Sequence, residues 1–381
     1  MREVLDKLRL FTAVLLLLAL STPAAPSTAT SPGKPDDDLS RHPLYSRYDF
    51  GNTSGVINFG TQPLAVPIGV IGEVMQRDRI LTEELGKIGL EIRFHPFLKG
   101  DDINFFLRRG RIDAAMGGDM PTIVTASSFD ILVTALAKQG YSSIVTRGHF
   151  TIRGLKGKRI GYPPVSNAHY ALLAALESAG LKESEVRMVP MEVSEVVEAF
   201  TSGRIDAFAA WEPISSVALK RIHDAAAIYR YLNSSYLYFG RSLLDRHPEA
   251  ASLIVASMVR ALGWMKGKQD HLLLAGEWTL AAGKRLRGKP VPLSASEIAL
   301  LTMKDILSIT SSPIIPERDL AANGAIRKKF DFLKVRGQIS TEASWERLLQ
   351  SFDRATIAKV LANPKRYRLN SFDYAMEKPD R

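Results

Sequence analysis

The chain has 381 residues and contains no cysteine. This absence excludes a disulfide framework, a thiol nucleophile and a cysteine-based metal site. It also excludes a lipid attached to a cysteine behind the N-terminal apolar segment. Beyond that segment, no apolar run approaches the ~20 residues that a membrane-spanning helix needs. We therefore expect the mature chain to be soluble.

The sequence also lacks the patterns of several functional classes. The formal net charge is +10, but its lysines and arginines are scattered and no aromatic residues alternate with them. We therefore expect no nucleic-acid binding; the basic charge either attracts anionic ligands or simply confers solubility. There is no Gly-x-Ser-x-Gly, His-Glu-x-x-His or Gly-x-Gly-x-x-Gly pattern. We accordingly assign no catalytic residues, no metal and no cofactor.

The N-terminus has the pattern of a secretory signal. Arg2, Lys7 and Arg9 precede an apolar stretch at 10–20, and small residues follow at 21–29. This pattern predicts a cleavable signal peptide at 1–25 and export to the periplasm. An uncleaved membrane anchor is the alternative, although the apolar stretch is short for one. Residues 26–54 are rich in Pro, Ser, Thr, Gly and Asp, which predicts a flexible leader.

Two stretches of the chain, 109–118 and 202–213, share the pattern Gly-Arg-Ile-Asp-Ala. In each, a glycine ends a helix, a turn contains Asp113 or Asp206, and a short apolar segment suits a buried parallel strand. The repetition predicts two similar α/β lobes, and two facing lobes form a cleft for a ligand.

The remaining pattern predicts alternating strands and helices that are closed by later helices. Strands are expected at 129–137 and 143–147, with 139–141 as a candidate crossing point between lobes. Long helices are expected at 249–266, 270–284 and 294–307, and an amphipathic helical tail at 318–333. This order indicates parallel sheets with a helical C-terminal region.

In an open α/β sheet, ligands bind beyond the carboxyl ends of the strands. That rule selects the loops at 61–62, 117–122, 166–169 and 211–213. The 166–169 loop precedes a helix, so its polar residues either cap that helix or help its N–H groups bind an anion. Trp211 is either an aromatic wall of the pocket or part of the core.

Two carboxylates in these loops suggest a second kind of ligand group. Asp119 and Glu212 favour an amino or cationic group, although Asp119 could instead cap the next helix. The 166–169 loop favours an acidic group, so a small zwitterion or an amino-heterocycle satisfies both. His169 is not expected to bind a metal, because no His or Glu partner lies at helical spacing.

Taken in order, these motifs resemble a known family. Thr61-Gln62-Pro63, Leu155-Lys156-Gly157-Lys158 and Trp211-Glu212-Pro213 are similar to the nitrate, sulfonate, taurine and thiamine-precursor group of ABC-transporter substrate-binding proteins. The resemblance covers about residues 55–265. It implies an α/β fold of the type II periplasmic-binding-protein kind, with two doubly wound sheets joined by hinge strands. Lobe 1 would comprise 55–138 and 229–381, and lobe 2 would comprise 139–228.

The resemblance also implies a function and a site. The chain would capture a small anionic or zwitterionic ligand, such as a sulfonate, taurine, nitrate or a pyrimidine, and deliver it as a monomer to ABC permease subunits in the inner membrane. The ligand-binding residues carried over from the family are Gln62, Asp119, Met120, Ser166, Asn167, His169, Trp211 and Glu212.

Two alternatives remain open at this point. One is a ligand-binding module that serves a sensor, and the other is a small-molecule enzyme on the same fold. The missing cysteine weighs against the enzyme, because relatives that handle thiamine pyrimidine as enzymes carry a cysteine-rich motif.

Overall fold

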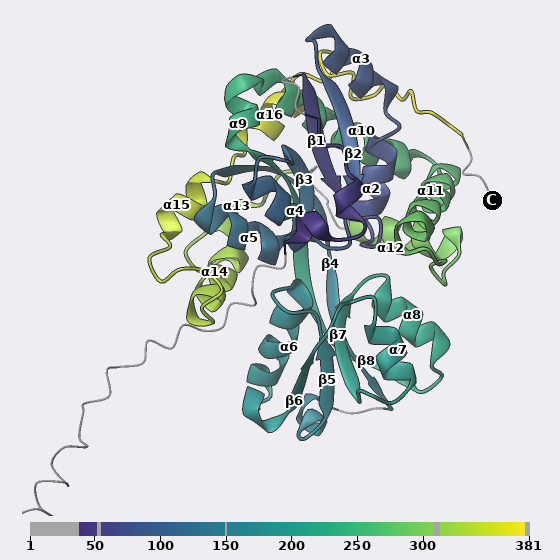
Figure 1. Ribbon diagram of the computed structural model, residues 1–381, viewed down its shortest axis with the longest axis vertical. Helices are drawn as coiled ribbons and strands as arrows, with labels where there is room; N and C mark the ends of the chain where they lie inside the picture. Colours follow the sequence, from purple (N-terminus) through teal and green to yellow (C-terminus); the bar gives the residue numbers. More distant parts are fainter. Residues whose placement is uncertain (1–37, 52–54, 149–150, 308–312, 378–381) are drawn as a thin grey trace, which may run out of the picture. The chain divides into compact units, whose positions relative to one another are not determined.

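The computed structural model describes residues 38–51, 55–148, 151–307 and 313–377 (Figure 1). The predicted signal peptide lies outside these residues. The chain divides into a unit that ends at His42 and a unit formed by 43–381. In the first unit the described residues form the 3₁₀-helix η1 (Leu39–Arg41), and all other elements belong to the second. Within the described ranges, we find no helix with the length and apolar character required to cross a bilayer.

The strands of the second unit form one sheet with the order β2-β1-β3-β8-β4-β7-β5-β6. Parallel pairs lie at both ends, β2-β1-β3 at one and β7-β5-β6 at the other. The strands are β1 (Val56–Thr61), β2 (Glu91–Pro96), β3 (Ala114–Gly118), β4 (Ile131–Arg147), β5 (Arg159–Tyr162), β6 (Arg187–Pro190), β7 (Ala207–Trp211) and β8 (Ala225–Gly240).

The two ends of the sheet are joined by β4 and β8, which pair antiparallel from Ile131↔Gly240 to Arg147↔Ala225. The sequence suggests two strands, 129–137 and 143–147, where the structure has the single strand β4. The register of β4 against β8 is irregular at three places but regular across 139–141, where the sequence suggested a break. Such irregularities bend a strand without ending it, so one strand serves both parts of the sheet.

Helices cover both faces of the sheet. Figure 1 shows α6 on one side of β5, β6 and β7, with α7 and α8 on the other. The helices are α2 (Ile68–Met75), α3 (Arg79–Lys87), α4 (Gly100–Arg108), α5 (Asp119–Ser128), α6 (Asn167–Ser178), α7 (Val196–Thr201), α8 (Ile214–Arg221), α9 (Arg241–Arg246), α10 (Pro248–Gly267), α11 (Gln269–Arg287), α12 (Ala295–Leu307), α13 (Glu317–Leu320), α14 (Ala325–Val335), α15 (Trp345–Gln350) and α16 (Ala355–Ala362). Short 3₁₀-helices are η2 (Tyr45–Arg47), η3 (Ile152–Leu155) and η4 (Glu183–Glu185).

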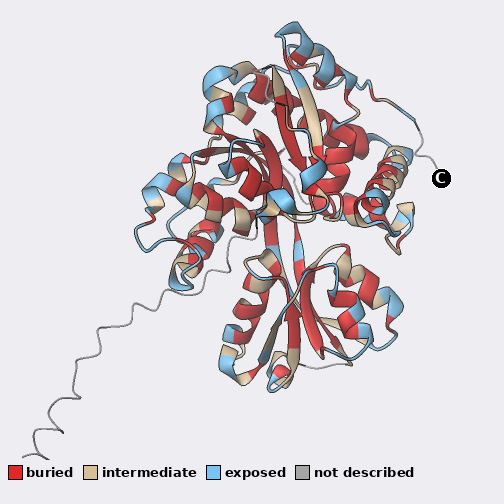
Figure 2. Ribbon diagram, in the orientation of Figure 1, coloured by how far each residue is buried: buried red, intermediate tan, exposed pale blue. Residues whose placement is uncertain are grey.

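The long C-terminal helices were expected, and the structure has them as α10, α11 and α12. The predicted helical tail at 318–333 is instead interrupted between α13 and α14, where Asn323 and Gly324 favour helix poorly. Figure 2 shows the strands and the helix sides that face them as buried. The buried apolar residues form a large cluster that includes Phe59, Phe208 and Leu237, and a separate one around Ile160 and Leu172.

The two Gly-Arg-Ile-Asp-Ala stretches occupy equivalent places at the two ends of the sheet. Gly110 and Gly203 follow α4 and α7 with positive φ angles of 65° and 73°, which glycine adopts without steric cost. Asp113 accepts a hydrogen bond from a backbone N–H of β1 at 2.8 Å, and Asp206 accepts the matching bond from β5 at 2.8 Å. Each aspartate thus anchors the start of a parallel strand pair.

Part of the segment predicted to be a flexible leader is packed. Tyr45 is 1% exposed and donates a hydrogen bond to Asp102 Oδ2 at 2.6 Å. The rings of Tyr45 and Tyr48 lie against Phe97, with centroids 4.9 and 5.6 Å away. The segment was predicted to be flexible from its polar composition, which gives no weight to its few aromatic residues. Burial of their rings offsets the entropic cost of ordering the backbone.

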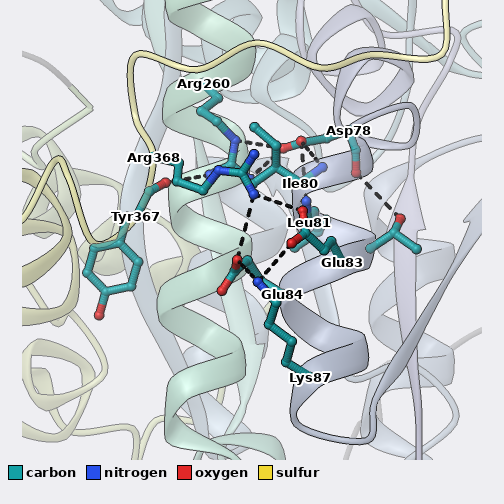
Figure 3. Close-up of polar contacts among 10 residues, drawn as sticks. Asp78, Ile80, Leu81, Glu83, Glu84, Lys87, Arg260, Tyr367 and Arg368 are labelled. Carbon is teal, nitrogen blue, oxygen red and sulfur yellow. Dashed lines mark hydrogen bonds and ion pairs between the residues drawn. The ribbon is translucent and has the colours of Figure 1, made fainter.

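A buried ion pair ties the C-terminal segment to the start of α3 (Figure 3). Arg260 on α10 contacts Asp78 Oδ2 through Nε at 3.0 Å and Nη2 at 2.6 Å, and its Nη1 donates to Tyr367 O at 2.7 Å. Asp78 Oδ1 accepts from the N–H groups of Ile80 and Leu81, which makes it the N-cap of α3. One carboxylate therefore joins three segments that are distant in sequence.

Candidate functional site

A cavity opens beside the crossing strands β4 and β8. Its lining comes from segments that follow β1, β2, β5 and β6, from the ends of β3 and β7, and from β4 and β8 themselves. Apolar side chains form much of the wall, among them Val66, Pro163, Pro164 and Trp211. An apolar wall with a few polar groups is typical of small-molecule sites.

Three helices begin at the cavity wall. Gly100 is the first residue of α4, Gly118 is the N-cap of α5, and Ser166 is the N-cap of α6; all three line the cavity. The first turn of a helix has N–H groups without helical partners and carries partial positive charge. Their convergence favours a negatively charged group in the cavity.

Amide side chains are held at the wall by hydrogen bonds. Gln62 Nε2 donates to a backbone oxygen of β3 at 2.8 Å, and Asn167 Oδ1 accepts from the first turn of α5 at 3.1 Å. Asn233 Nδ2, on β8, donates to Ser142 Oγ at 2.9 Å. These bonds fix the orientation of polar groups that a ligand would meet.

Four charged side chains complete the lining. Lys99 Nζ forms an ion pair with Glu192 Oε1 at 2.7 Å, and both side chains are well exposed at the cavity. Asp101 is also exposed. Lys138, on β4, is 6% exposed. The cavity thus has a paired cation near solvent and a second cation buried at the crossing strands.

The structure brings four of the predicted site residues to the cavity, namely Gln62, Ser166, Asn167 and Trp211. They follow β1, β5 and β7, where loops at the carboxyl ends of parallel strands meet. The other four, Asp119, Met120, His169 and Glu212, lie close to these loops in sequence but not in the lining.

Asp119 and Met120 form the first turn of α5 and are both 1% exposed. Asp119 Oδ2 forms an ion pair with Lys329 and accepts a hydrogen bond from Ser234 N at 2.9 Å. Asp119 Oδ1 has no hydrogen-bond partner within the described residues. The backbone N–H of Met120 bonds Asn167, so it holds a wall residue in place.

Glu212 and His169 are engaged with their own helices. Glu212 Oε2 accepts from Ser216 N at 3.1 Å in the first turn of α8. The backbone N–H of His169 donates to Ser166 Oγ at 3.2 Å, and its ring lies 4.5 Å from that of Tyr162. The described residues contain no cluster of three His, Asp or Glu side chains that could hold a metal ion.

We expect the imidazole of His169 to stay neutral well below the usual range for histidine. Burial lowers the pKa of His169 to about 4. Because this pKa lies below the unfolded value of about 6.5, the neutral ring favours the folded state above that pH. The contribution is lost as the pH falls from 6.5 towards 4. An NMR titration of the imidazole signals measures this directly, with His169→Phe to assign the signal; a midpoint near 6.5 would contradict it.

Sequence reasoning missed Lys138, Asn233 and Lys99. Lys138 had a signal in the sequence, because it is a charged residue that directly follows the strongly apolar stretch 131–137. Asn233 had none, because an amide in an aromatic-rich strand resembles many surface residues. Lys99 follows the second strand and could have been found by the strand-end rule, had that rule been applied to every parallel strand.

Two α/β regions joined by two crossing strands, with a cavity at the crossing, define the two-lobed type II periplasmic-binding-protein fold. Residues 132–271 match the NMT1/THI5-like family. The taurine-binding periplasmic protein of Escherichia coli (strain K12) is 26% identical over 284 residues, which is 71% of this chain and 85% of that protein. The resemblance predicted from the motifs is therefore confirmed.

Solved structures confirm the fold. The alkanesulfonate-binding protein SsuA from Xanthomonas axonopodis pv. citri, bound to MOPS, has a TM-score of 0.60 at 17% identity, covering 80% of this chain and 100% of SsuA. The desulfurization enzyme DSZB has a TM-score of 0.56 at 14% identity, covering 81% of this chain and 99% of DSZB. The fold thus occurs in both a binding protein and an enzyme.

Proposed function

We propose that this chain is an extracytoplasmic solute-binding protein that encloses a small organic anion between two lobes. The observation that carries the proposal is the composition of the cavity: an apolar wall, three helix N-termini and a buried lysine. Such a site pairs an anionic group with positive potential and an organic body with apolar surface. Nitrate has no organic body, so it would bury less apolar surface against this wall than a sulfonate, taurine or an aromatic acid.

The lobes in this proposal are 55–138 with 229–381, and 139–228, with β4 and β8 as the hinge. Contacts that link these regions include the Lys99–Glu192 ion pair and the bond from Met120 N to Asn167 Oδ1. Ligand binding would favour the arrangement in which such contacts are formed, as a shift between open and closed populations.

Delivery to ABC permease subunits from the periplasm, as a monomer, follows from the same proposal. The names of the taurine-binding and alkanesulfonate-binding proteins support it, as does the secretory pattern at the N-terminus. We propose binding rather than catalysis, because the taurine-binding relative is named as a binding protein and the cavity lining offers positive groups for an anion.

A ligand screen tests the proposal. Thermal unfolding of the purified chain is measured with each of five compounds separately: ethanesulfonate, taurine, nitrate, an aminopyrimidine and benzoate. Each compound is also incubated with the folded chain and then analysed for chemical change. At least one organic anion should raise the unfolding midpoint, because a ligand that binds only the folded state stabilises it. Trp211→Ala should lower the affinity for that ligand about tenfold or more, because the apolar contact with the indole ring is lost. Titration calorimetry measures both affinities.

Other outcomes decide against the proposal. Stabilisation only by the aminopyrimidine would replace the organic anion with a different ligand class. Turnover of a stabilising compound would establish the enzyme instead. No stabilisation by any probe would remove the support for a small-anion binding protein.

A further inference from the structure

Lys138 occupies an unusual position in the hinge. It lies on β4 opposite Ser235 of β8, immediately after an irregularity in register between Leu136 and Lys138. Irregularities of this kind redirect side chains and are common beside functional sites. Here the side chain of Lys138 reaches the cavity, although the stretch before it, 131–137, is almost wholly buried and apolar.

The ammonium group of Lys138 is incompletely satisfied. Within the described residues it makes one hydrogen bond, to Asn233 Oδ1, and no ion pair within 4.0 Å. Asn233 is held in this orientation, because its Nδ2 donates to Ser142 Oγ. An ammonium has three N–H donors, so two remain for a group in the cavity. A buried charge without an ionic partner is costly, and a ligand anion would remove that cost.

Four charged groups from different segments of the chain act on the ammonium group of Lys138. Asp305 on α12, Asp119 on α5 and Glu212 after β7 attract it from a distance, and Lys329 on α14 repels it. Asp119 is already paired with Lys329. Burial lowers the pKa of Lys138 against the attraction of Asp305. The surrounding carboxylates therefore favour a cation at this place, and among the described residues none of them lies within 4.0 Å of its ammonium group.

We propose that Lys138 binds the anionic end of the ligand and so restricts the site to organic oxyanions, that is sulfonates or carboxylates. The proposal rests on the solute-binding function above and names the ligand class of that site. The anionic end lies at the crossing strands against Lys138 and Asn233, and the organic body extends along Trp211. Because Lys138 belongs to the hinge strand β4, the ligand charge contacts a strand that both lobes share.

The test compares Lys138→Met with the wild-type chain. Methionine keeps the length and apolar stem of lysine but removes its charge. The affinity for ethanesulfonate and for propionate should fall about 10- to 100-fold, as expected for loss of a hydrogen bond between charged groups. Lys266→Met removes one positive charge from the exposed end of α10 and controls for net charge. Titration calorimetry gives the affinities, and urea unfolding checks that each variant is folded.

A pH series gives a readout that a purely structural lysine would not produce. The wild-type affinity should fall as the pH rises, because Lys138 loses its proton and burial lowers its pKa below the usual range for lysine, whereas the affinity of Lys138→Met should stay flat. Affinity in Lys138→Met within about threefold of the wild type would overturn the role of Lys138 but leave solute binding intact. A wild-type chain that binds only neutral or cationic probes also overturns it. A wild-type chain that binds no probe overturns both proposals.

Discussion

Arg260→Met is expected to cost about 3–5 kcal/mol of folding free energy, the range observed when one partner of a buried ion pair is removed. Arg260 and Asp78 are 2% and 0% exposed in their side chains. Without the guanidinium, Asp78 Oδ2 keeps only the bond from Ser257 Oγ at 2.7 Å. The Tyr367 carbonyl also loses its donor, so the link between α10 and the C-terminal segment is weakened, whereas Asp78 Oδ1 keeps its bonds to the first turn of α3.

Urea unfolding followed by circular dichroism measures this loss. The matched control is Arg368→Met, because Arg368 contacts Glu83 at 2.8 Å with both side chains more than a third exposed. Exposed pairs contribute at most about 1 kcal/mol, so this variant should be close to the wild type. Adding Asp78→Asn to Arg260→Met should restore part of the stability, since the uncompensated charge disappears. If the folding free energy of Arg260→Met lay within about 1 kcal/mol of the wild-type value, this account of the ion pair would be wrong.

The fold was largely predictable because its local signals are strong. The repeated Gly-Arg-Ile-Asp-Ala stretches predicted two α/β regions, and Asp113 and Asp206 do occupy matching positions. What the sequence could not convey was continuity across the crossing strands. Residues 139–141 look like a break between two strands because Gly140 interrupts the apolar pattern. In the structure a Cβ on Gly140 would come within 2.0 Å of Asp305 Oδ2, so a larger residue there would force the Asp305 side chain to move.

The site was predictable only in part, for a different reason. The strand-end rule placed Gln62, Asn167 and Trp211 at the cavity because it depends on topology alone. It does not say which way a residue in a first helical turn points, and Asp119 turns away from the lining. Periodicity does place Lys329, which is 4% exposed, on the buried face of α14 with Ile326 and Leu333. It does not identify the residue with which this buried lysine pairs.

Lys329 joins parts of the molecule that a ligand would also need in fixed positions. From α14 it forms the ion pair with Asp119, and its Nζ lies 5.8 Å from the ring centroids of both Tyr170 and Tyr231. Tyr170 belongs to α6, which begins at the cavity, and Tyr231 belongs to the crossing strand β8. Asp119 in turn accepts from Ser234 N on the same strand. This polar cluster is a support behind the cavity wall.

Lys329→Met is therefore expected to destabilise the fold by about 3–5 kcal/mol, because Asp119 is left buried without its cation. Asp119→Asn should also destabilise, and the double variant Asp119→Asn/Lys329→Met should be more stable than the sum of the single changes predicts. Urea unfolding of the four chains gives the coupling. Lys328→Met, which changes the exposed neighbour, is the control.

The same variants separate a supporting Asp119 from one that contacts the ligand. A contact residue would lose affinity on Asp119→Asn while the folding free energy changed little. A supporting residue loses folding free energy first, and the affinity of the folded fraction falls by a smaller factor. Affinity measured by calorimetry well below the unfolding midpoint distinguishes the two. A large loss of affinity with unchanged stability would move Asp119 into the binding site, as its carry-over from the family implies.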